Sequence, residues 1–262
     1  MPRFQAIFSD IDGTLLNPQH QLSPRNRAAG RAVVAAGIPI VLVSARPPAA
    51  MRPLAEALGP GLPLIALNGA LILDGADRII QQWALSPADL ATLATLLAEA
   101  PALLRHDYCG RHWYCADPTH PRCRRETAII GLEPEPRPAA SGPVHKVLLL
   151  GPAALISHWA ERLGAALPTL NVQRSKEDYL EITAAGAAEA EALRWLCARQ
   201  GWNPARVLAL GDGDNDLPLL KAAGHGVALA QAPAAVRAAA DEVAPSNGDD
   251  GWAVVLEREF LA

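Results

Sequence analysis

The sequence predicts an α/β fold in which a doubly wound, mostly parallel sheet carries an inserted α+β cap. In the first and last parts of the chain, short apolar runs alternate with longer stretches rich in Ala and Leu. This alternation is typical of parallel strands joined by helices. In the middle of the chain it gives way to a hairpin-like pair of runs and a proline-rich connection. The 262 residues suffice for two parts. We expect a core built from residues 1–85 and 184–262 and a cap built from residues 86–183.

The core elements are predicted from apolar runs and from signals at helix ends. Ser23-Pro24 and Ser86-Pro87 each combine an N-cap residue with proline at the first helical position, and Gly37 follows the first of these helices. A further helix is expected over Ala187–Arg199, before Gly201. Five apolar runs are predicted as buried strands: Phe4–Ser9, Ile38–Val43, Leu62–Leu67, Val207–Leu210 and Gly226–Leu229.

The cap is expected to combine helices with a separate sheet. After the helix that starts at Ser86, two runs form a hairpin that turns at Gly110, and residues 133–143, with four prolines, form a loop. The remaining cap elements are predicted in order: the hairpin strands Leu103–Cys109 and His112–Ala116, the strand Val144–Leu150, the helix Ala153–Ala166, and the strands Asn171–Ser175 and Tyr179–Thr183.

Composition excludes several classes of protein. The net charge of −4 and the low basic content argue against partners such as nucleic acid or an anionic membrane. Four cysteines are too few for a disulfide scaffold and favour a reducing compartment. No apolar run approaches the ~18 residues of a membrane span, and the N-terminus lacks the pattern of a signal peptide. We therefore expect a soluble cytoplasmic protein.

Polar or glycine-containing segments follow four of the predicted core strands. In open parallel sheets, ligands bind at the carboxyl ends of the strands. We therefore expect these segments to meet at one edge of the sheet. They are Asp10-Ile11-Asp12-Gly13-Thr14, Ser44-Ala45-Arg46-Pro47, Asn68-Gly69 and Gly211-Asp212-Gly213-Asp214-Asn215-Asp216.

This edge would gather four carboxylates, from Asp10, Asp12, Asp212 and Asp216. Crowded carboxylates repel one another unless they are protonated or neutralised by a cation. Their oxygens, with room for water and a phosphate, suit Mg²⁺. Ser44 adds a hydroxyl and nearby N–H groups for a phosphate. Such a site could transfer a phosphoryl group, with one aspartate attacking phosphorus and another handling the leaving-group proton.

Other ligand-binding motifs are excluded by specific residues. The run Asp212-x-Asp214-x-Asp216 begins like a calcium loop, but Leu217 and Ala223 stand where that loop requires glycine and glutamate. The chain has no G-x-x-x-x-G-K-[ST] phosphate loop, and no G-x-G-x-x-G opens a helix. A standard P-loop nucleoside triphosphatase or dinucleotide enzyme is therefore not expected.

The motifs resemble those of the haloacid dehalogenase superfamily. Phe8-Ser9-Asp10-Ile11-Asp12-Gly13-Thr14-Leu15-Leu16 resembles its first motif, and Gly211–Asp216 its fourth. Asn68-Gly69-Ala70, Tyr179–Thr183 and Asn247–Gly251 are similar to the Cof-type sugar-phosphate phosphatases, whose cap is inserted into a Rossmann-like core after the third strand. The resemblance covers essentially the whole chain and implies a Mg²⁺-dependent phosphatase that acts on a small phosphorylated metabolite.

The resemblance also implies a role for individual residues. Asp10 would be the nucleophile that forms an aspartyl-phosphate, and Asp12 would protonate the leaving alcohol and then activate water. Mg²⁺ would be held by Asp10, by the carbonyl or carboxylate of Asp12, and by Asp212, with support from Asp216. The phosphate would be held by Ser44 and the backbone of Ile11 and Ala45, with Asn215 nearby.

Two residues depart from the family pattern. Ala45 stands where the family has glycine, and its methyl group would crowd the backbone beside a phosphate. Glu189 stands where the third motif has a lysine. A carboxylate ~4 Å from a phosphate oxygen would cost roughly 4 kcal/mol at an effective dielectric constant of ~20. Either Glu189 turns away, or another cation replaces the lysine, or activity is low.

The chain has three lysines that could replace this charge: Lys146, Lys176 and Lys221. Lys146 lies in a predicted cap strand, and Lys221 is expected to face solvent. Our hypothesis is that Lys176, just before the last cap strand, or Arg46, which follows Ser44, supplies the missing charge. The alternative is that both are ordinary surface or substrate-end residues.

The cap also contains an unusual series of histidines and cysteines, and a basic run. The spacing of the series suggests a zinc site, but alternate residues of a hairpin face opposite sides. The alternative, which we favour, is that these six are ordinary hairpin residues that bind no metal. The basic run 122–125 is expected to be a solvated helix face rather than a second anion site. The series comprises His106, Cys109, His112, Cys115, His120 and Cys123.

Two alternatives to the phosphatase remain. A phosphomutase of similar build would isomerise a sugar phosphate instead of releasing phosphate. The second alternative is a protein that binds a phosphate ligand or regulates another process and has lost turnover. Glu189 in place of the family lysine suggests this alternative.

Overall fold

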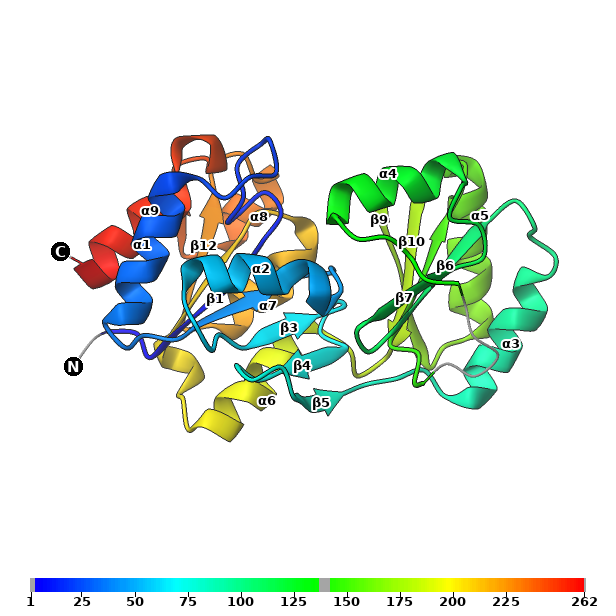
Figure 1. Cartoon of the computed structure of the whole chain (residues 1–262), viewed down its shortest axis with the longest axis horizontal. Helices are drawn as coiled ribbons and strands as arrows, with labels where there is room; N and C mark the ends of the chain where they lie inside the picture. Colours follow the sequence, from blue (N-terminus) through cyan, green and yellow to red (C-terminus); the bar gives the residue numbers. More distant parts are fainter. Residues whose placement is uncertain (1–2, 137–141, 262) are drawn as a thin grey trace.

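The computed structural model describes residues 3–136 and 142–261 and divides them between two sheets (Figure 1). In the described part of the chain, the larger sheet has eight strands in the order β13-β12-β11-β1-β2-β3-β4-β5. The smaller sheet has five strands in the order β7-β6-β8-β10-β9. The larger sheet draws on residues 6–82 and 207–244, and the smaller one on residues 104–184. That these parts are separate core and cap domains with the expected boundaries stays a prediction.

The strands of the larger sheet are short and buried in its middle. Strands β13 to β3 pair in parallel, whereas β4 and β5 pair antiparallel at one edge. The bounds are β1 (Ala6–Asp10), β2 (Ile40–Val43), β3 (Leu64–Ala66), β4 (Leu71–Leu73), β5 (Ile79–Gln82), β11 (Val207–Gly211), β12 (His225–Leu229) and β13 (Glu242–Ala244). The predicted doubly wound, mostly parallel sheet is confirmed, and β4, β5 and β13 are additions to the strands expected from the sequence.

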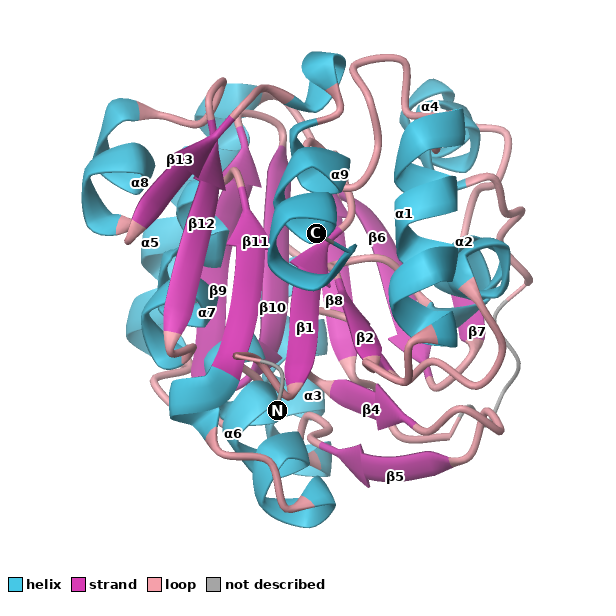
Figure 2. Ribbon diagram, turned by 90° about the vertical axis from the view of Figure 1, so that its left-hand side faces the viewer, coloured by secondary structure: helices cyan, strands magenta, loops and turns pink. Residues whose placement is uncertain are grey.

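Helices cover both faces of this sheet (Figure 2). Ile7 of β1 packs with the helices α1, α2 and α9, whereas its neighbour Phe8 packs with α6, α7 and α8. Because successive side chains of a strand point to opposite faces, one continuous apolar run fills both cores. The helices are α1 (Pro24–Ala35), α2 (Pro48–Leu58), α3 (Pro87–Leu97), α4 (Pro121–Ile130), α5 (Ala153–Ala166), α6 (Glu189–Gln200), α7 (Leu217–Ala222), α8 (Ala234–Ala239) and α9 (Gly251–Leu256).

The helix-end signals of the sequence act as expected. The Ser23 and Ser86 side chains accept hydrogen bonds from the backbone N–H groups of Asn26 and Asp89. Such bonds satisfy N–H groups that have no partner inside the helix. Gly201 follows α6 in the left-handed conformation. None of the described helices has the length and apolarity that a membrane span needs.

The smaller sheet is antiparallel and lies beside the larger one. Gly110, with φ +62°, makes the predicted hairpin turn. Helices α3 and α5 pack on one face of this sheet and α4 on the other. Part of the proline-rich loop expected over residues 133–143 lies outside the described residues. The strands are β6 (Leu104–Cys109), β7 (His112–Cys115), β8 (Lys146–Leu150), β9 (Leu170–Lys176) and β10 (Tyr179–Ala184).

Candidate active site

The carboxyl end of β1 places Asp10 in a buried position. Asp10 is only 7% exposed and is the last residue of the strand. Its carbonyl accepts a hydrogen bond from the Ser9 hydroxyl at 2.7 Å, and the Ser9 oxygen in turn accepts one from the Trp252 indole at 2.8 Å. Trp252 is fully buried. The core therefore holds the backbone at Asp10 rigidly.

The loop after β11 fixes Asp216 through its own backbone. One carboxylate oxygen, Oδ2, accepts hydrogen bonds from the N–H groups of Asp212 at 2.9 Å and Gly213 at 2.8 Å. The other, Oδ1, accepts one from the Asn215 amide at 2.9 Å. Asp212 itself accepts hydrogen bonds at 3.3 Å from Thr14 and from the Gln231 amide. The side chains of the fourth segment are thus held in place on one side of β1.

The carboxylates of Asp10, Asp212 and Asp216 come together, each offering an oxygen within 4.8 Å of the others. Burial, with repulsion from the neighbouring acids, raises the pKa of Asp10 well above its usual value. Burial likewise raises the pKa of Asp212, and it raises that of Asp216 to about 6. Crowded hard oxygens of this kind are a suitable ligand set for Mg²⁺, which would relieve the repulsion.

Gly13 lets the first and fourth segments approach closely. Its φ is +89°, and a Cβ atom there would lie 2.3 Å from Oδ2 of Asp212. Both the backbone conformation and the contact therefore require glycine.

Asp12 does not join the three carboxylates. Its two oxygens accept hydrogen bonds from Nε and a terminal nitrogen of Arg46, both at 2.6 Å, and His20 lies 3.2 Å away. Burial alone would raise the pKa of Asp12, but the bonds from Arg46 and His20 hold it below the usual value. Asp12 is therefore ionised and oriented by an arginine fork.

The segments surround a cavity of about 430 Å³ between the two sheets. On the side of the larger sheet, the lining includes the Asp cluster, Asp12, Ser44, Ala45, Arg46 and Asn215. On the other side it includes Tyr108 and Tyr179 of the smaller sheet and Ile130 at the end of α4. Ser44 is buried at the end of β2 and accepts a hydrogen bond from the Arg46 N–H at 3.2 Å. Ile11, between Asp10 and Asp12 in the chain, is fully buried.

A buried lysine that the sequence analysis left aside also lines this cavity. Lys146, the first residue of β8, is 3% exposed. Its ammonium group donates hydrogen bonds to the carbonyl of Ala45 at 2.9 Å and to Oδ1 of Asn68 at 3.0 Å, and it lies 3.3 Å from Oε1 of Glu181. A charged residue in an otherwise apolar strand was the sequence signal that could have identified it.

Glu189 remains in the site rather than turning to solvent. It is 9% exposed, begins α6, and lines a smaller cavity of about 230 Å³ beside the first. Its Oε2 has no hydrogen-bond partner among the described residues. Burial and the charges of Asp216 and Glu181 raise its pKa well above the usual value, although Lys146 opposes this. The polar segment Asn68-Gly69 packs directly behind Glu189, because Gly69 (φ +88°) lies against the backbone of Ala188.

The two proposed replacement cations lie in the cavity lining but in different settings. Arg46 donates two hydrogen bonds to the carboxylate of Asp12. The Lys176 ammonium lies 4.6 Å from the centre of the Tyr179 ring, in an exposed part of β9. Lys221 is exposed on α7, as expected.

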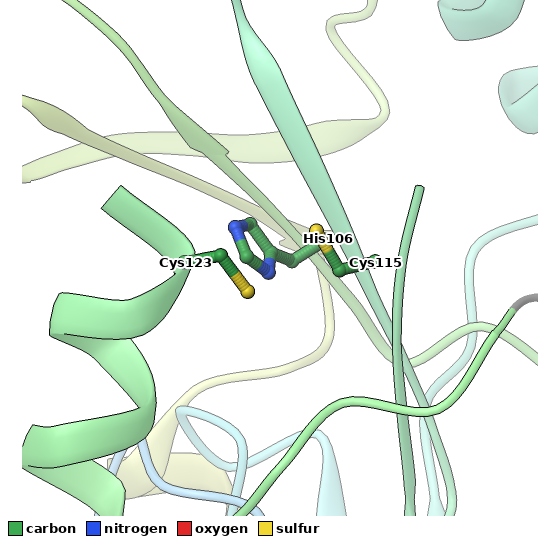
Figure 3. Close-up of side chains that lie close together, drawn as sticks. All are labelled: His106, Cys115 and Cys123. Carbon is green, nitrogen blue, oxygen red and sulfur yellow. The ribbon is translucent and has the colours of Figure 1, made fainter. Parts of the chain in front are cut away.

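Three of the six cap histidines and cysteines do converge (Figure 3). His106 and Cys115 are cross-strand partners in β6 and β7, and Cys123 reaches them from α4. Their ligand atoms lie within 4.8 Å of one another. However, the Trp113 indole donates a 2.9 Å hydrogen bond to Nδ1 of His106. An indole N–H can only donate, so the proton of the neutral ring lies on Nε2 and neither nitrogen is ready to bind a metal.

Comparisons with known proteins identify the family of the chain. The family model described as haloacid dehalogenase-like hydrolase matches residues 7–256. A protein of Haemophilus influenzae to which phosphatase activity has been attributed is 34% identical over 98% of both chains. The pyridoxal phosphate phosphatase of Escherichia coli is 28% identical over 98% of this chain and 99% of its own. The crystal structure of a haloacid dehalogenase-like hydrolase from Bacteroides thetaiotaomicron has a TM-score of 0.91 and 30% identity, covering 98% of this chain and 100% of that one.

The chain therefore belongs to the haloacid dehalogenase-like hydrolases. The resemblance predicted from the first and fourth motifs is confirmed, and so is the expectation of a hydrolytic enzyme.

Proposed function

We propose that this protein is a Mg²⁺-dependent phosphatase that hydrolyses a small phosphorylated metabolite, such as a sugar phosphate, through an aspartyl-phosphate. The observation that carries the proposal is the convergence of the Asp10, Asp212 and Asp216 carboxylates within 4.8 Å, at the wall of a cavity large enough for a small metabolite. Relatives of the chain are named as phosphatases of pyridoxal phosphate and of a phosphoribitylaminouracil, which are both small monoesters.

In the first step, a carboxylate oxygen of Asp10 attacks phosphorus, and the bond between phosphorus and the alcohol oxygen breaks. The departing oxygen takes a proton from Asp12. Because Asp12 is ionised beside Arg46, it must first take that proton from solvent water as the substrate binds, and the dianionic phosphate brings negative charge that raises the proton affinity of Asp12. In the second step, Asp12 accepts a proton from water, and the water oxygen displaces Asp10 from phosphorus.

Mg²⁺ would be held by Asp10 and Asp212, with Asp216 in support, and would neutralise charge on the transferring group. Ser44 and the N–H groups of Ile11 and Ala45 would bind the phosphate oxygens, and Asn215 lies beside them in the cavity lining. The smaller sheet would close the cavity and exclude water from the aspartyl-phosphate.

The test is phosphate release from a panel of phosphorylated metabolites, in Mg²⁺ and in EDTA, with Asp10→Asn as control. We expect release in Mg²⁺, none in EDTA, and none from Asp10→Asn. Release that survives Asp10→Asn would overturn the nucleophile. Isomerisation without release would identify a phosphomutase. Phosphate binding without turnover of any compound would favour the binding or regulatory protein that Glu189 suggests.

A further inference from the structure

The cavity that would receive a phosphate is rich in carboxylates and has few cations. Asp10, Asp212 and Asp216 form the proposed metal site, and Glu189 lies buried beside them. A divalent cation offsets part of this charge, but a phosphate dianion adds two further negative charges. An anion bound in a partly buried site of this kind needs a fixed positive group.

Among the described residues, four basic side chains contribute to the cavity lining: His20, Arg46, Lys146 and Lys176. Arg46 and His20 both bind Asp12, and Lys176 lies over a tyrosine ring near solvent. Lys146 differs from the others in being almost fully buried. A buried ammonium group is stable only where nearby acceptors replace its water, so its position in the fold is well defined.

The contacts of Lys146 cross from the smaller sheet to the larger one. Lys146 and Glu181 belong to β8 and β10, whereas Ala45 and Asn68 follow β2 and β3. Lys146 donates to the Ala45 carbonyl, and Asn68 donates to Oε2 of Glu181 at 2.6 Å. The Ala45 carbonyl belongs to the Ala45–Arg46 peptide group, which directly follows the peptide group that carries the Ala45 N–H. Lys146 therefore anchors the segment proposed to bind the phosphate and places a positive charge beside it.

We infer that Lys146 is the cation of the phosphate site, so that the cap supplies a charge that the core lacks. This inference rests on the proposed phosphatase function. Lys146 is a positioning residue that acts through the Ala45 peptide and through its charge. Because its partners Ala45 and Asn68 lie on the core, the charge enters the site when the cap closes and leaves when it opens. Phosphate binding and cap closure are therefore coupled.

The test compares Lys146→Met with Lys221→Met, which removes an exposed lysine outside the site. We expect kcat/KM for the best substrate of the panel to fall about 100-fold in Lys146→Met, as for loss of a charge-assisted contact, and to stay unchanged in Lys221→Met. Adding Glu189→Lys to Lys146→Met moves the charge into the core and should recover at least tenfold. Glu189→Lys in the wild type is the control, because a purely structural role of Lys146 predicts the same gain from Glu189→Lys with and without Lys146.

A second measurement keeps the inference testable if Lys146→Met is unstable or if the protein hydrolyses nothing. Inorganic phosphate with Mg²⁺ should raise the Tm of the wild type and of Lys146→Met/Glu189→Lys, but not that of Lys146→Met. Equal Tm shifts in the wild type and in Lys146→Met would overturn the inference. A loss of kcat/KM in Lys176→Met that Lys146→Met does not share would also overturn it. If the wild type shows the phosphate shift without turnover and Lys146→Met shows no shift, the proposed function fails, whereas the role of Lys146 in phosphate binding stands.

Discussion

Replacement of Gly13 by alanine tests whether the close approach of the first and fourth segments organises the metal site. The added Cβ would lie 2.3 Å from Oδ2 and 2.5 Å from Oδ1 of Asp212. Ordinary contact begins at about 3.5 Å, so the Asp212 carboxylate must retreat by roughly 1 Å. A displacement of that size in a reacting site costs about 100-fold in rate. We expect Gly13→Ala to lower kcat/KM by about this factor and to require more Mg²⁺ for half-maximal phosphate release.

Gly37→Ala is the matched control. Gly37 has φ +84°, close to the +89° of Gly13, but a Cβ there meets nothing within 4 Å. Both substitutions should therefore cost roughly 1–2 kcal/mol of stability through the left-handed backbone, whereas Gly13→Ala alone should change the Mg²⁺ titration. The same Mg²⁺ dependence and kcat/KM in the two variants would refute the argument from close approach.

Three further predictions concern protonation and metal binding. Arg46→Met removes the cation that keeps the pKa of Asp12 low, so the acidic inflection in the pH profile of phosphate release should move to higher pH, and an unmoved inflection would contradict the role of this pair. Two buried histidines, His106 and His145, have their pKa lowered by burial to about 4, so both rings should stay neutral in the folded protein at pH 5. Each alone would lower the stability at pH 5, but the raised pKa values of Asp10, Glu189 and Asp216 act in the opposite sense, so the rings themselves must be observed. An NMR titration should show neither ring protonated between pH 7.5 and pH 5, and an inflection near pH 6.5 would contradict the assignment. Purified protein should contain no stoichiometric zinc by elemental analysis, because the Trp113 indole occupies Nδ1 of His106; one zinc per chain would show that this bond yields to a metal.

The parts of the site that could be predicted from the sequence are those set by local chain geometry. Asp10 follows an apolar run that is too short and too uniformly buried to be anything but a central strand. Asp212 and Asp216 follow a second such run, and the two strands are neighbours. The carboxyl ends of adjacent parallel strands must meet at one edge, so the acidic cluster follows from the sequence pattern alone.

Elements that depend on packing were harder to predict. Strands β4 and β13 have three residues each, and α7 and α8 have six residues each, which is too short for a periodic pattern to be distinctive. The hairpin pattern indicated that six histidines and cysteines could not converge. It could not show that Cys123, from another element, would join the pair formed by His106 and Cys115.

The environment of Lys146 could not be predicted, because it arises from the contact between cap and core. In the sequence, Lys146 is one charged residue at the start of an apolar strand, and nothing nearby in the chain indicates Ala45 or Asn68 as its partners. The sequence led us to expect Lys176, just before the last cap strand, or Arg46, two residues after Ser44, as the replacement cation. The structure shows Arg46 bound instead to Asp12.

The hydrogen bonds between the two sheets bear on the proposed closure of the cap. Lys146 contacts Ala45 and Asn68, and Asn68 contacts Glu181, all at 2.6–3.0 Å between nitrogen and oxygen. Hydrogen bonds lose most of their strength when stretched beyond about 3.5 Å, so a rigid-body opening of the cap would break these contacts together. In the open state water would solvate Lys146, whereas in the closed state the protein must replace that water. An anion bound in the cavity helps to replace the lost water around Lys146 in the closed state, and it has no such effect in the open state. The anion therefore binds the closed state more tightly and shifts the equilibrium towards closure.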